Sequence, residues 1–268
     1  MSLAGEVLAG LVELAFPALC CCCGRPLGPG TADFCPACCA ALMADAGPHC
    51  PRCADRLGPF EAADTTGCAR CRHLRWHFDA SVRLGPYQHF WKYVVLRCKH
   101  LGGELLAEAL GGLLASQHAQ RWSELAGAAG AAVVVVPVPL HWTRRLLRGY
   151  NQAAALATGL ARRRGWPCEP WALRRTRSTG WQSERTFEQR SANVRGAFAL
   201  AVAPARIQGR VVILVDDVYT SGSTLSECAR LLRRAGAVRV VAAVVAHGQN
   251  PDTQPTMPML TEPSQSIS

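Results

Sequence analysis

The sequence predicts an α/β fold, in which a parallel sheet with flanking helices follows a small cysteine-rich module. Two apolar runs predict strands of the sheet. Val133–Val136 and Val211–Val215 are rich in β-branched residues, as strands covered on both faces require. The distribution of cysteines predicts the module, since eleven of the fourteen cysteines fall between Cys20 and Cys71. With 268 residues the chain can bury one sizeable core and still hold such a module.

The chain opens with an apolar stretch that we expect to form an amphipathic helix over residues 1–17. Leu3, Val7, Leu11 and Leu14 recur at helical spacing. Two glutamates interrupt the stretch and no basic start precedes it, which argues against a membrane span or a signal peptide. We expect the helix to pack on the body, with a membrane-surface role as the alternative. Without an export signal the expected location is cytoplasmic, where cysteines typically serve as metal ligands or free thiols.

Residues 18–75 contain four Cys-x-x-Cys knuckles. Two knuckles separated by a dozen or so residues form a tetrahedral Cys₄ zinc ribbon, because each turn points two thiolates at one ion. We expect two structural zinc ions in tandem sites, one formed by Cys20, Cys23, Cys35 and Cys38 and the other by Cys50, Cys53, Cys68 and Cys71. An interleaved pairing is the alternative. A redox dithiol is disfavoured because no βαβ pattern surrounds the pairs.

The second domain is expected over residues 78–248. A bridge over 78–100 leads to an apolar helix, Gly102–His118. The strand Val133–Val136 is followed by a proline-stiffened loop and the helix Asn151–Arg164. Ligands of open α/β sheets collect at the carboxyl ends of strands, so this loop should face a binding crevice. Its pyrophosphate-binding candidates are Arg144, Arg145, Arg148, Asn151 and Gln152.

The strongest signal follows the strand Val211–Val215. Two adjacent carboxylates come next, then a loop of hydroxyls and glycine that opens the helix Leu225–Arg234. Helix N-termini bind anions, and paired carboxylates can hold ribose hydroxyls directly or through Mg²⁺. The candidate residues are Asp216, Asp217, Thr220, Ser221, Gly222, Ser223 and Thr224. This order of features looks like the phosphoribosyl-pyrophosphate (PRPP) signature of type I phosphoribosyltransferases, which implies PRPP bound with Mg²⁺. A capped helix without a ligand is the alternative.

Three further segments complete the domain and its surroundings. Residues between Trp171 and Leu200 are polar and charged, which suits a mobile lid carrying Arg174, Arg175 and Arg177. We expect a last strand over residues 238–246 and, from composition, a disordered tail over residues 249–268.

Positive charge is concentrated in one segment. The net charge is +10, and residues 141–200 carry twelve arginines against three glutamates, whereas residues 1–140 are balanced at eleven each. Such a segment suggests binding of pyrophosphate or a nucleic-acid backbone, with a solvated arginine-rich surface as the alternative. Trp142 and Trp181 lie among these arginines and could stack unpaired bases, unless they are core or hinge residues.

Taken together, these motifs resemble the ComF family. The resemblance spans about residues 15–247 and rests on the following elements: the four knuckles, Pro137-Val138-Pro139, Arg148-Gly149-Tyr150-Asn151-Gln152, Arg190-x-x-Asn193-Val194-x-Gly196-Ala197-Phe198, the Asp216–Thr224 segment, and Lys99 with Gly102. The family combines a double zinc ribbon with a phosphoribosyltransferase-type domain and is associated with DNA uptake in natural transformation. The resemblance implies PRPP, single-stranded DNA and the uptake machinery at the inner membrane as partners.

Departures from the family pattern are few and leave the phosphate-binding residues in place. Ser221 stands where a second threonine is more common, Tyr150 replaces a common phenylalanine, and Gln88-His89 interrupts the usual Tyr-x-Gly.

Catalysis does not follow from a PRPP site alone, because transfer also needs a nucleophile pocket. Glu184 and Glu188 are interpreted as solvated helix charges, and His141 and His247 as structural or capping residues. Two hypotheses result: a competence protein that handles single-stranded DNA in the cytoplasm and uses a PRPP site, or an active Mg²⁺-dependent phosphoribosyltransferase acting on a base or amine.

Overall fold

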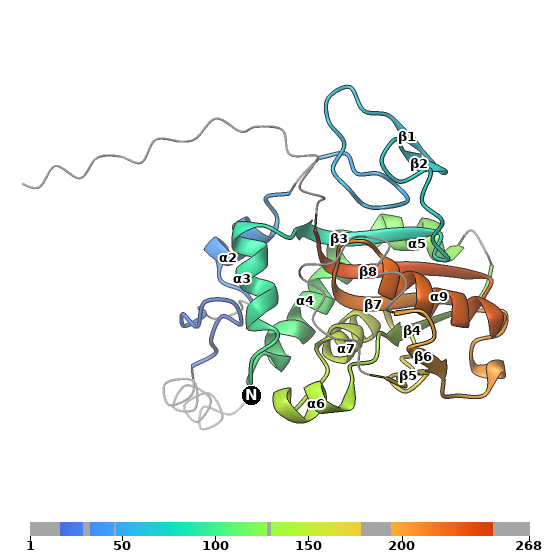
Figure 1. The fold of residues 1–268 in the computed structure, drawn as a ribbon. Helices are drawn as coiled ribbons and strands as arrows, with labels where there is room; N and C mark the ends of the chain where they lie inside the picture. Colours follow the sequence, from blue (N-terminus) through green and yellow to red (C-terminus); the bar gives the residue numbers. More distant parts are fainter. Residues whose placement is uncertain (1–16, 29–32, 46, 128–129, 178–193, 249–268) are drawn as a thin grey trace, which may run out of the picture.

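The computed structural model describes residues 17–28, 33–45, 47–127, 130–177 and 194–248 (Figure 1). The expected N-terminal helix, the C-terminal tail and most of the expected lid, with Trp181, Glu184 and Glu188, lie outside these ranges. Within them, no helix is both long enough and apolar enough to cross a membrane.

The elements alternate as an α/β protein requires. The helices are α2 (Pro36–Leu42), α3 (His89–Arg97), α4 (Glu104–Gln117), α5 (Ala119–Gly127), α6 (Trp142–Arg148), α7 (Gln152–Arg164) and α9 (Ser223–Arg234), with a 3-10 turn at Pro204–Arg206. The strands are β1 (Ala63–Asp64), β2 (Gly67–Cys68), β3 (Ala80–Pro86), β4 (Val133–Pro137), β5 (Leu173–Arg175), β6 (Phe198–Leu200), β7 (Val211–Tyr219) and β8 (Arg239–His247).

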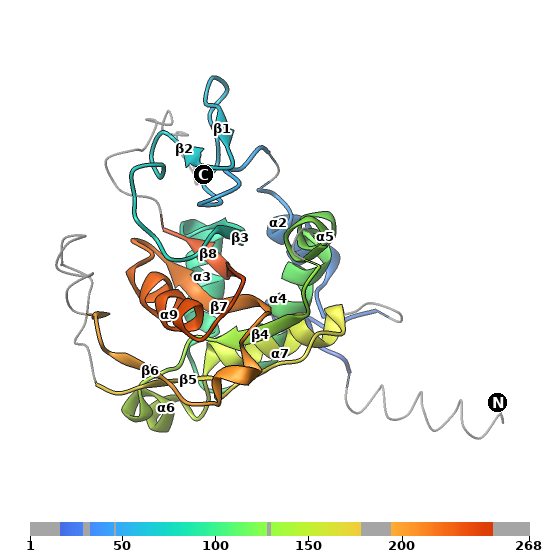
Figure 2. The same ribbon diagram turned by 90° about the vertical axis from the view of Figure 1, so that its right-hand side faces the viewer.

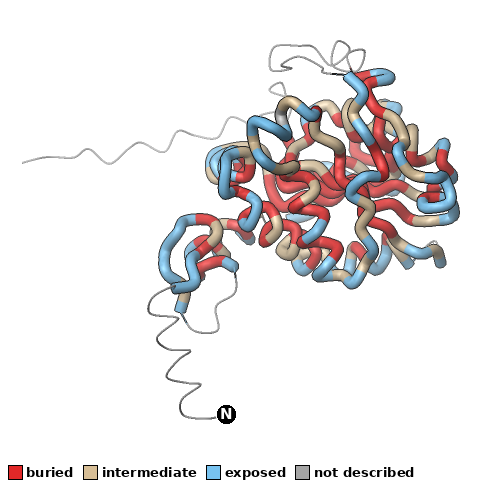
Figure 3. Tube along the Cα trace, turned by 90° about the horizontal axis from the view of Figure 1, so that it is seen from below, coloured by how far each residue is buried: buried red, intermediate tan, exposed pale blue. Residues whose placement is uncertain are grey.

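A four-stranded parallel sheet forms the centre, in the order β3-β8-β7-β4. This confirms the expected α/β class and the two strands found from their apolar runs. Alternate residues of each strand face opposite layers: Ile213 packs with α3, α4 and α7, whereas Leu214 packs with α9. Figure 2 shows α9 on one side of the sheet and α4 and α7 on the other. The buried residues concentrate accordingly in the middle of the molecule (Figure 3).

Helices α4 and α7 approach each other closely because each contributes a glycine. A Cβ atom on Gly111 would lie 2.1 Å from the carbonyl oxygen of Leu156, and one on Gly159 would lie 1.9 Å from that of Glu108. Only hydrogen at both positions lets the two backbones touch. This pair fixes α7, and therefore the residues at its N-terminus, against the rest of the fold.

Three segments differ from the sequence-based expectation. The bridge over 78–100 contains a real strand, β3, at the sheet edge, followed by helix α3. The arginine-bearing loop after β4 is largely the helix α6, capped by His141, whose Nδ1 accepts from the backbone N–H of Thr143 at 3.4 Å. Strand β7 does not end at Val215 but continues to Tyr219, because pairing with β8 extends to Tyr219↔His247.

An antiparallel pair, β5 with β6, lies at the two ends of the segment that was expected to form a lid. The two cysteine-rich units lie in different places. The first, with α2, lies beside α3, and the second, with β1 and β2, lies over the sheet near β3, β7 and β8 (Figures 1 and 2).

Candidate functional site

Eight of the fourteen cysteines form two groups of four, in the tandem partition predicted from the knuckle spacing. Within each group all Sγ atoms lie within 4.8 Å of one another. Measured Sγ–Sγ separations are 3.7 Å for Cys23–Cys35 and Cys50–Cys71 and 3.8 Å for Cys53–Cys68. A tetrahedral zinc ion with Zn–S bonds of about 2.3 Å requires sulfur atoms about 3.8 Å apart. The donor set and its geometry therefore fit a closed Cys₄ metal site in each unit.

Backbone N–H groups donate hydrogen bonds to two of these sulfur atoms, as they would to thiolates. The N–H of Cys35 points at Sγ of Cys20, and the N–H of Cys68 points at Sγ of Cys50, both at 3.3 Å. Hydrogen bonds from the Cys53 thiol and neighbouring N–H groups lower the pKa of Cys50 to about 4. The Cys50 sulfur and burial raise the pKa of Cys53, and burial raises the pKa of Cys71 to about 11, so these ligands would lose their protons as a metal binds.

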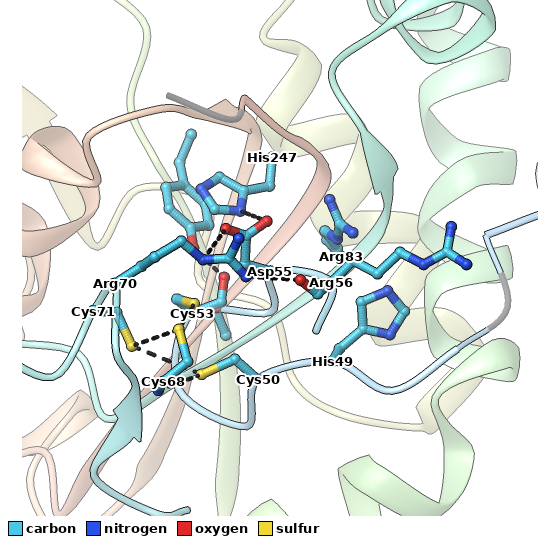
Figure 4. Close-up of polar contacts among 12 residues, drawn as sticks. His49, Cys50, Cys53, Asp55, Arg56, Cys68, Arg70, Cys71, Arg83 and His247 are labelled. Atoms are coloured by element: carbon cyan, nitrogen blue, oxygen red, sulfur yellow. Dashed lines mark hydrogen bonds and ion pairs between the residues drawn. The ribbon is translucent and has the colours of Figure 1, made fainter. Parts of the chain in front are cut away.

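A shell of charged side chains joins the second cysteine group to the sheet (Figure 4). Asp55 lies between Arg70, at 3.4 Å, and His247 of β8, at 3.8 Å. Burial lowers the pKa of His247 to about 4 and the Asp55 charge only partly opposes it, so the imidazole is neutral near pH 7. His247 stacks on Tyr219 with ring centroids 4.0 Å apart. The predicted structural role of His247 agrees with this burial.

The acidic pair lies where the sheet narrows from four strands to three. Strand β4 ends at Pro137, which pairs with Val215, so Asp216 and Asp217 extend beyond it and stay next to β8. Ligand sites of parallel sheets form at such carboxyl ends. Asp217 is buried, and its Oδ2 lies 2.9 Å from Nζ of Lys99, which follows α3.

The pKa values of the two carboxyl groups are shifted in opposite directions. Burial raises the pKa of Asp216 well above its usual range, and the neighbouring Asp217 charge adds to the shift. Burial also opposes ionisation of Asp217, but the Lys99 ammonium outweighs it and holds the pKa of Asp217 below its usual range. One lysine therefore balances one carboxylate, and Asp217 loses its proton more readily than Asp216.

Among the predicted pyrophosphate-binding residues, Gln152 makes a hydrogen bond to this acidic pair. Nε2 of Gln152 donates to Oδ2 of Asp217 at 3.4 Å, and Arg148 donates to Oε1 of Gln152 at 3.2 Å. Asn151 caps α7, since its Oδ1 accepts from the N–H of Ala153 and its Nδ2 donates to the carbonyl of Val138. Arg145 turns away and lies over the Trp171 ring, 4.6 Å from its centroid. The Arg144 side chain lies outside the described atoms.

The hydroxyl loop between β7 and α9 has the form expected of a helix-opening anion site. Gly222 has a φ of 73°, which a residue with a side chain rarely adopts, and it directly precedes Ser223, the first residue of α9. The hydroxyls of Ser221 and Ser223 lie 2.9 Å apart. Candidate residues Thr220–Thr224 and the acidic pair are thus consecutive at one strand end.

One end of the lid segment is tied to α9. The N–H of Gly196 donates to Oε1 of Glu227 at 2.8 Å, and Arg230 donates to the same carboxylate at 2.7 and 2.8 Å. These Arg230 hydrogen bonds, opposed by partial burial, lower the pKa of Glu227. Glu227 has a structural role here that its sequence context does not indicate.

Sequence reasoning missed the residues that connect separate elements. Lys99 entered only through a family element, and Trp76, Arg52 and Tyr219 carried no signal. Trp76 lies in a linker, yet its Nε1 donates to the carbonyl of Ser221 at 3.0 Å. Such long-range contacts have no local pattern to find.

The chain matches known proteins along most of its length. Residues 148–258 match the family described as the phosphoribosyl transferase domain. The chain is 32% identical over 229 residues to the DNA utilization protein YhgH of Escherichia coli K12, covering 85% of this chain and 96% of that protein. It is 32% identical over 191 residues to competence protein F of Haemophilus influenzae, covering 70% of this chain and 80% of that protein.

One solved structure that matches part of this chain is the glutamine PRPP amidotransferase of B. subtilis, which is 20% identical, with a TM-score of 0.35, over 56% of this chain and 30% of that chain. With two Cys₄ groups ahead of a phosphoribosyltransferase domain, and with relatives that match along most of its length, the chain belongs to the ComF/YhgH family.

Proposed function

We propose that this protein binds PRPP with Mg²⁺ at the carboxyl end of β7 and that it assists the handling of single-stranded DNA in the cytoplasm during DNA uptake. The observation that carries the first part is the acidic pair held by Lys99 immediately before the loop that opens α9. The Thr220–Thr224 backbone and hydroxyls would hold the 5′-phosphate. Asp216 and Asp217 would hold the ribose hydroxyls or the metal.

The site has the chemistry that Mg²⁺ and ribose require. Mg²⁺ prefers oxygen ligands and keeps several waters, so two carboxyl groups and substrate oxygens suffice. Lys99 and Arg148 lie on the same hydrogen-bonded set and would face the negative pyrophosphate. The two Cys₄ groups we assign to structural zinc, because a closed four-thiolate site leaves no position for a substrate.

The DNA part of the proposal is supported by two exposed tryptophans beside α6. Trp142 is 64% exposed and Trp171 is 61% exposed, so neither is a core residue. Arg145 lies over the Trp171 ring, and Arg148 is one helical turn further along α6. Aromatic faces beside guanidinium groups bind single strands by stacking bases and neutralising phosphates. The names of the two relatives, one for competence and one for DNA utilization, support the same direction.

A second candidate function is Mg²⁺-dependent transfer of the phosphoribosyl group to a base or amine. The intact acidic pair and its lysine favour it, since a protein that only binds DNA has no need of them. A screen of bases and amines for PRPP-dependent pyrophosphate release tests this function directly.

Calorimetric titration of the full chain with PRPP and Mg²⁺ tests the binding proposal. Replacing Asp216 and Asp217 together by Asn keeps their shape and removes the charge, and it should weaken PRPP binding by about tenfold or more. Glu104→Gln, at an exposed position in the first turn of α4, is the control and should bind as wild type. Unchanged affinity in the double variant would mean that the loop is only a capped helix.

A further inference from the structure

The loop that would hold the 5′-phosphate is supported from outside its own strand and helix. Trp76 and His77 belong to the linker between the second cysteine unit and β3. The indole Nε1–H of Trp76 donates to the carbonyl of Ser221 at 3.0 Å, and the N–H of His77 donates to Oγ of Ser226 at 3.1 Å. A Cβ atom on Gly222 would lie 3.0 Å from the same indole nitrogen. The loop backbone therefore lies directly against the indole ring.

Trp76 is in turn fixed by the second cysteine unit. The Arg52 guanidinium lies over the indole, 5.4 Å from the ring centroid. Arg52 stands between the ligand positions Cys50 and Cys53, and its guanidinium donates to the carbonyls of Cys71 and Leu74. One side chain thus spans both knuckles of the unit and ends on Trp76. Apart from this unit, Phe78 stacks on Trp76 with centroids 4.9 Å apart.

A second link reaches the strand side of the loop. Tyr219, the last residue of β7, is 3% exposed, and its hydroxyl donates to the carbonyl of Cys53. The ring of Trp76 meets that of Tyr219 edge-on, with centroids 6.1 Å apart. The Cys50–Cys53 knuckle therefore holds the residues on both sides of Thr220, through Tyr219 before it and through Trp76 against Ser221 after it.

The first cysteine unit contacts helices α3 and α4. Arg97 of α3 donates to the carbonyl of Cys22 at 3.1 Å, and Gln117 of α4 donates to that of Leu42 at 3.4 Å. Its buried residues pack with Trp91 and Val94 of α3. The two units have the same ligand set but different neighbours, which makes the first an internal control for the second.

We propose that the second cysteine unit positions the phosphate loop, with Trp76 and Tyr219 as the positioning residues. This inference rests on the proposed PRPP site. A metal bound by Cys50, Cys53, Cys68 and Cys71 fixes the knuckle, the knuckle fixes the two aromatic residues, and these hold the loop amides in the geometry that accepts a phosphate. A loop that is already ordered loses less entropy on binding, so PRPP affinity depends on this unit. The first unit contributes to stability alone.

The mildest test is Trp76→Phe, which keeps an aromatic ring near Arg52 and Phe78 and removes the N–H donor together with the five-membered part of the indole. Loss of one hydrogen bond should weaken PRPP binding by about fivefold and speed hydrogen exchange of the amides of residues 220–224, with metal content unchanged. Trp91→Phe, in the core beside the first unit, is the control. Wild-type affinity and unchanged exchange in Trp76→Phe would overturn the proposal.

The decisive comparison is between Cys68→Ser and Cys38→Ser in the full chain. Each should lose one metal ion, but only Cys68→Ser should weaken PRPP binding, by about tenfold or more, and speed exchange of the loop amides. Equal effects of both variants, or no effect of Cys68→Ser, would overturn the proposal. If the wild type does not bind PRPP, the proposed function fails. Exchange in the ligand-free proteins still decides whether the second unit holds the loop.

Discussion

Nζ of Lys99 lies 2.9 Å from Oδ2 of Asp217, and this ion pair joins the end of α3 to the end of β7. The ammonium is the counter-charge for an acidic pair of which Asp217 is buried and Asp216 is half-buried. Burial alone would lower the pKa of Lys99, but Asp217 raises it, so the pair stays ionised near pH 7. The free energy of unfolding of the protein and the charge of the candidate site therefore both depend on this ion pair.

Lys99→Met should destabilise the protein near pH 7. The substitution keeps most of the apolar stem and leaves a buried carboxylate without its partner. The Lys99 side chain is 26% exposed, so we expect a loss of about 2 kcal/mol, below the range of fully buried pairs. Urea unfolding followed by circular dichroism measures it. Lys92→Met, at an exposed position of α3, is the control, and equal stability of the two variants would contradict the prediction.

Binding of Mg²⁺ and PRPP should release a proton from Asp216. Because its pKa is raised, this carboxyl keeps its proton to higher pH in the free protein, whereas Mg²⁺ favours the carboxylate and lowers the pKa in the complex. Protons leave on binding, so the apparent affinity should rise with pH up to the pKa of the free protein. Calorimetry at pH 7 in buffers of different ionisation enthalpy measures the release. A release that persists in Asp216→Asn would assign the proton to another group.

The sequence was sufficient for features whose signal is local. The β-branched runs identified β4 and β7, and knuckle spacing identified both cysteine groups and their tandem pairing. Prediction from the sequence failed where contacts with other segments determine the structure. The length of β7 depends on pairing with β8, which no property of Asp216 or Tyr219 reveals. The arginines after β4 form a helix because His141 caps it and Gly149, with a φ of 78°, ends it.

The same limit applies to the candidate site. The acidic pair and the hydroxyl loop stand next to each other in sequence and were found together. Lys99, Gln152 and Trp76 come from three other segments, and only the fold brings them to Asp217 and Ser221. Gln152 and Lys99 were named from the sequence, but their contacts with Asp217 were not predicted, and Trp76 was missed, because contacts between distant segments depend on the fold and not on spacing.

The purified protein should contain two zinc ions per chain. Closed Cys₄ sites with the observed sulfur separations bind zinc tightly, and the short units around them have few other sources of folding energy. Metal analysis by mass spectrometry gives the number. Cys98→Ser is the matched control, because Cys98 is a buried thiol outside both groups and its loss should leave two ions. Absence of zinc, or oxidised knuckle cysteines, would contradict the assignment.

Glu227→Gln should destabilise the fold by about 1–2 kcal/mol. The Glu227 side chain is 8% exposed and joins Arg230 to the Gly196 N–H, so the uncharged amide weakens two contacts that tie the lid base to α9. Glu124→Gln is a close control. Glu124 also pairs with an arginine three residues away, at 3.1 Å, but its side chain is 51% exposed, and its loss should change stability by less than about 0.5 kcal/mol. Thermal unfolding of both variants compares them, and equal shifts would show that burial is not the deciding factor.

Single-stranded DNA should bind across α6, with Trp142 and Trp171 as stacking residues. Trp142→Ala and Trp171→Ala should each weaken binding of an unstructured oligonucleotide by roughly 1–3 kcal/mol, the usual value of one stacked base. Phe60→Ala, which removes a fully exposed aromatic ring in the second cysteine unit, is the control and should bind as wild type.

The arginines of the same helix make a separate contribution. Replacing Arg144, Arg145 and Arg148 together by Ala removes three positive charges without removing an aromatic ring. Each phosphate contact releases counterions, so affinity should fall steeply with salt in the wild type and less steeply in the triple variant. Fluorescence anisotropy across a salt series measures both slopes. A flat salt dependence in the wild type, or full binding by the triple variant, would place DNA elsewhere and favour phosphoribosyl transfer as the role of this domain.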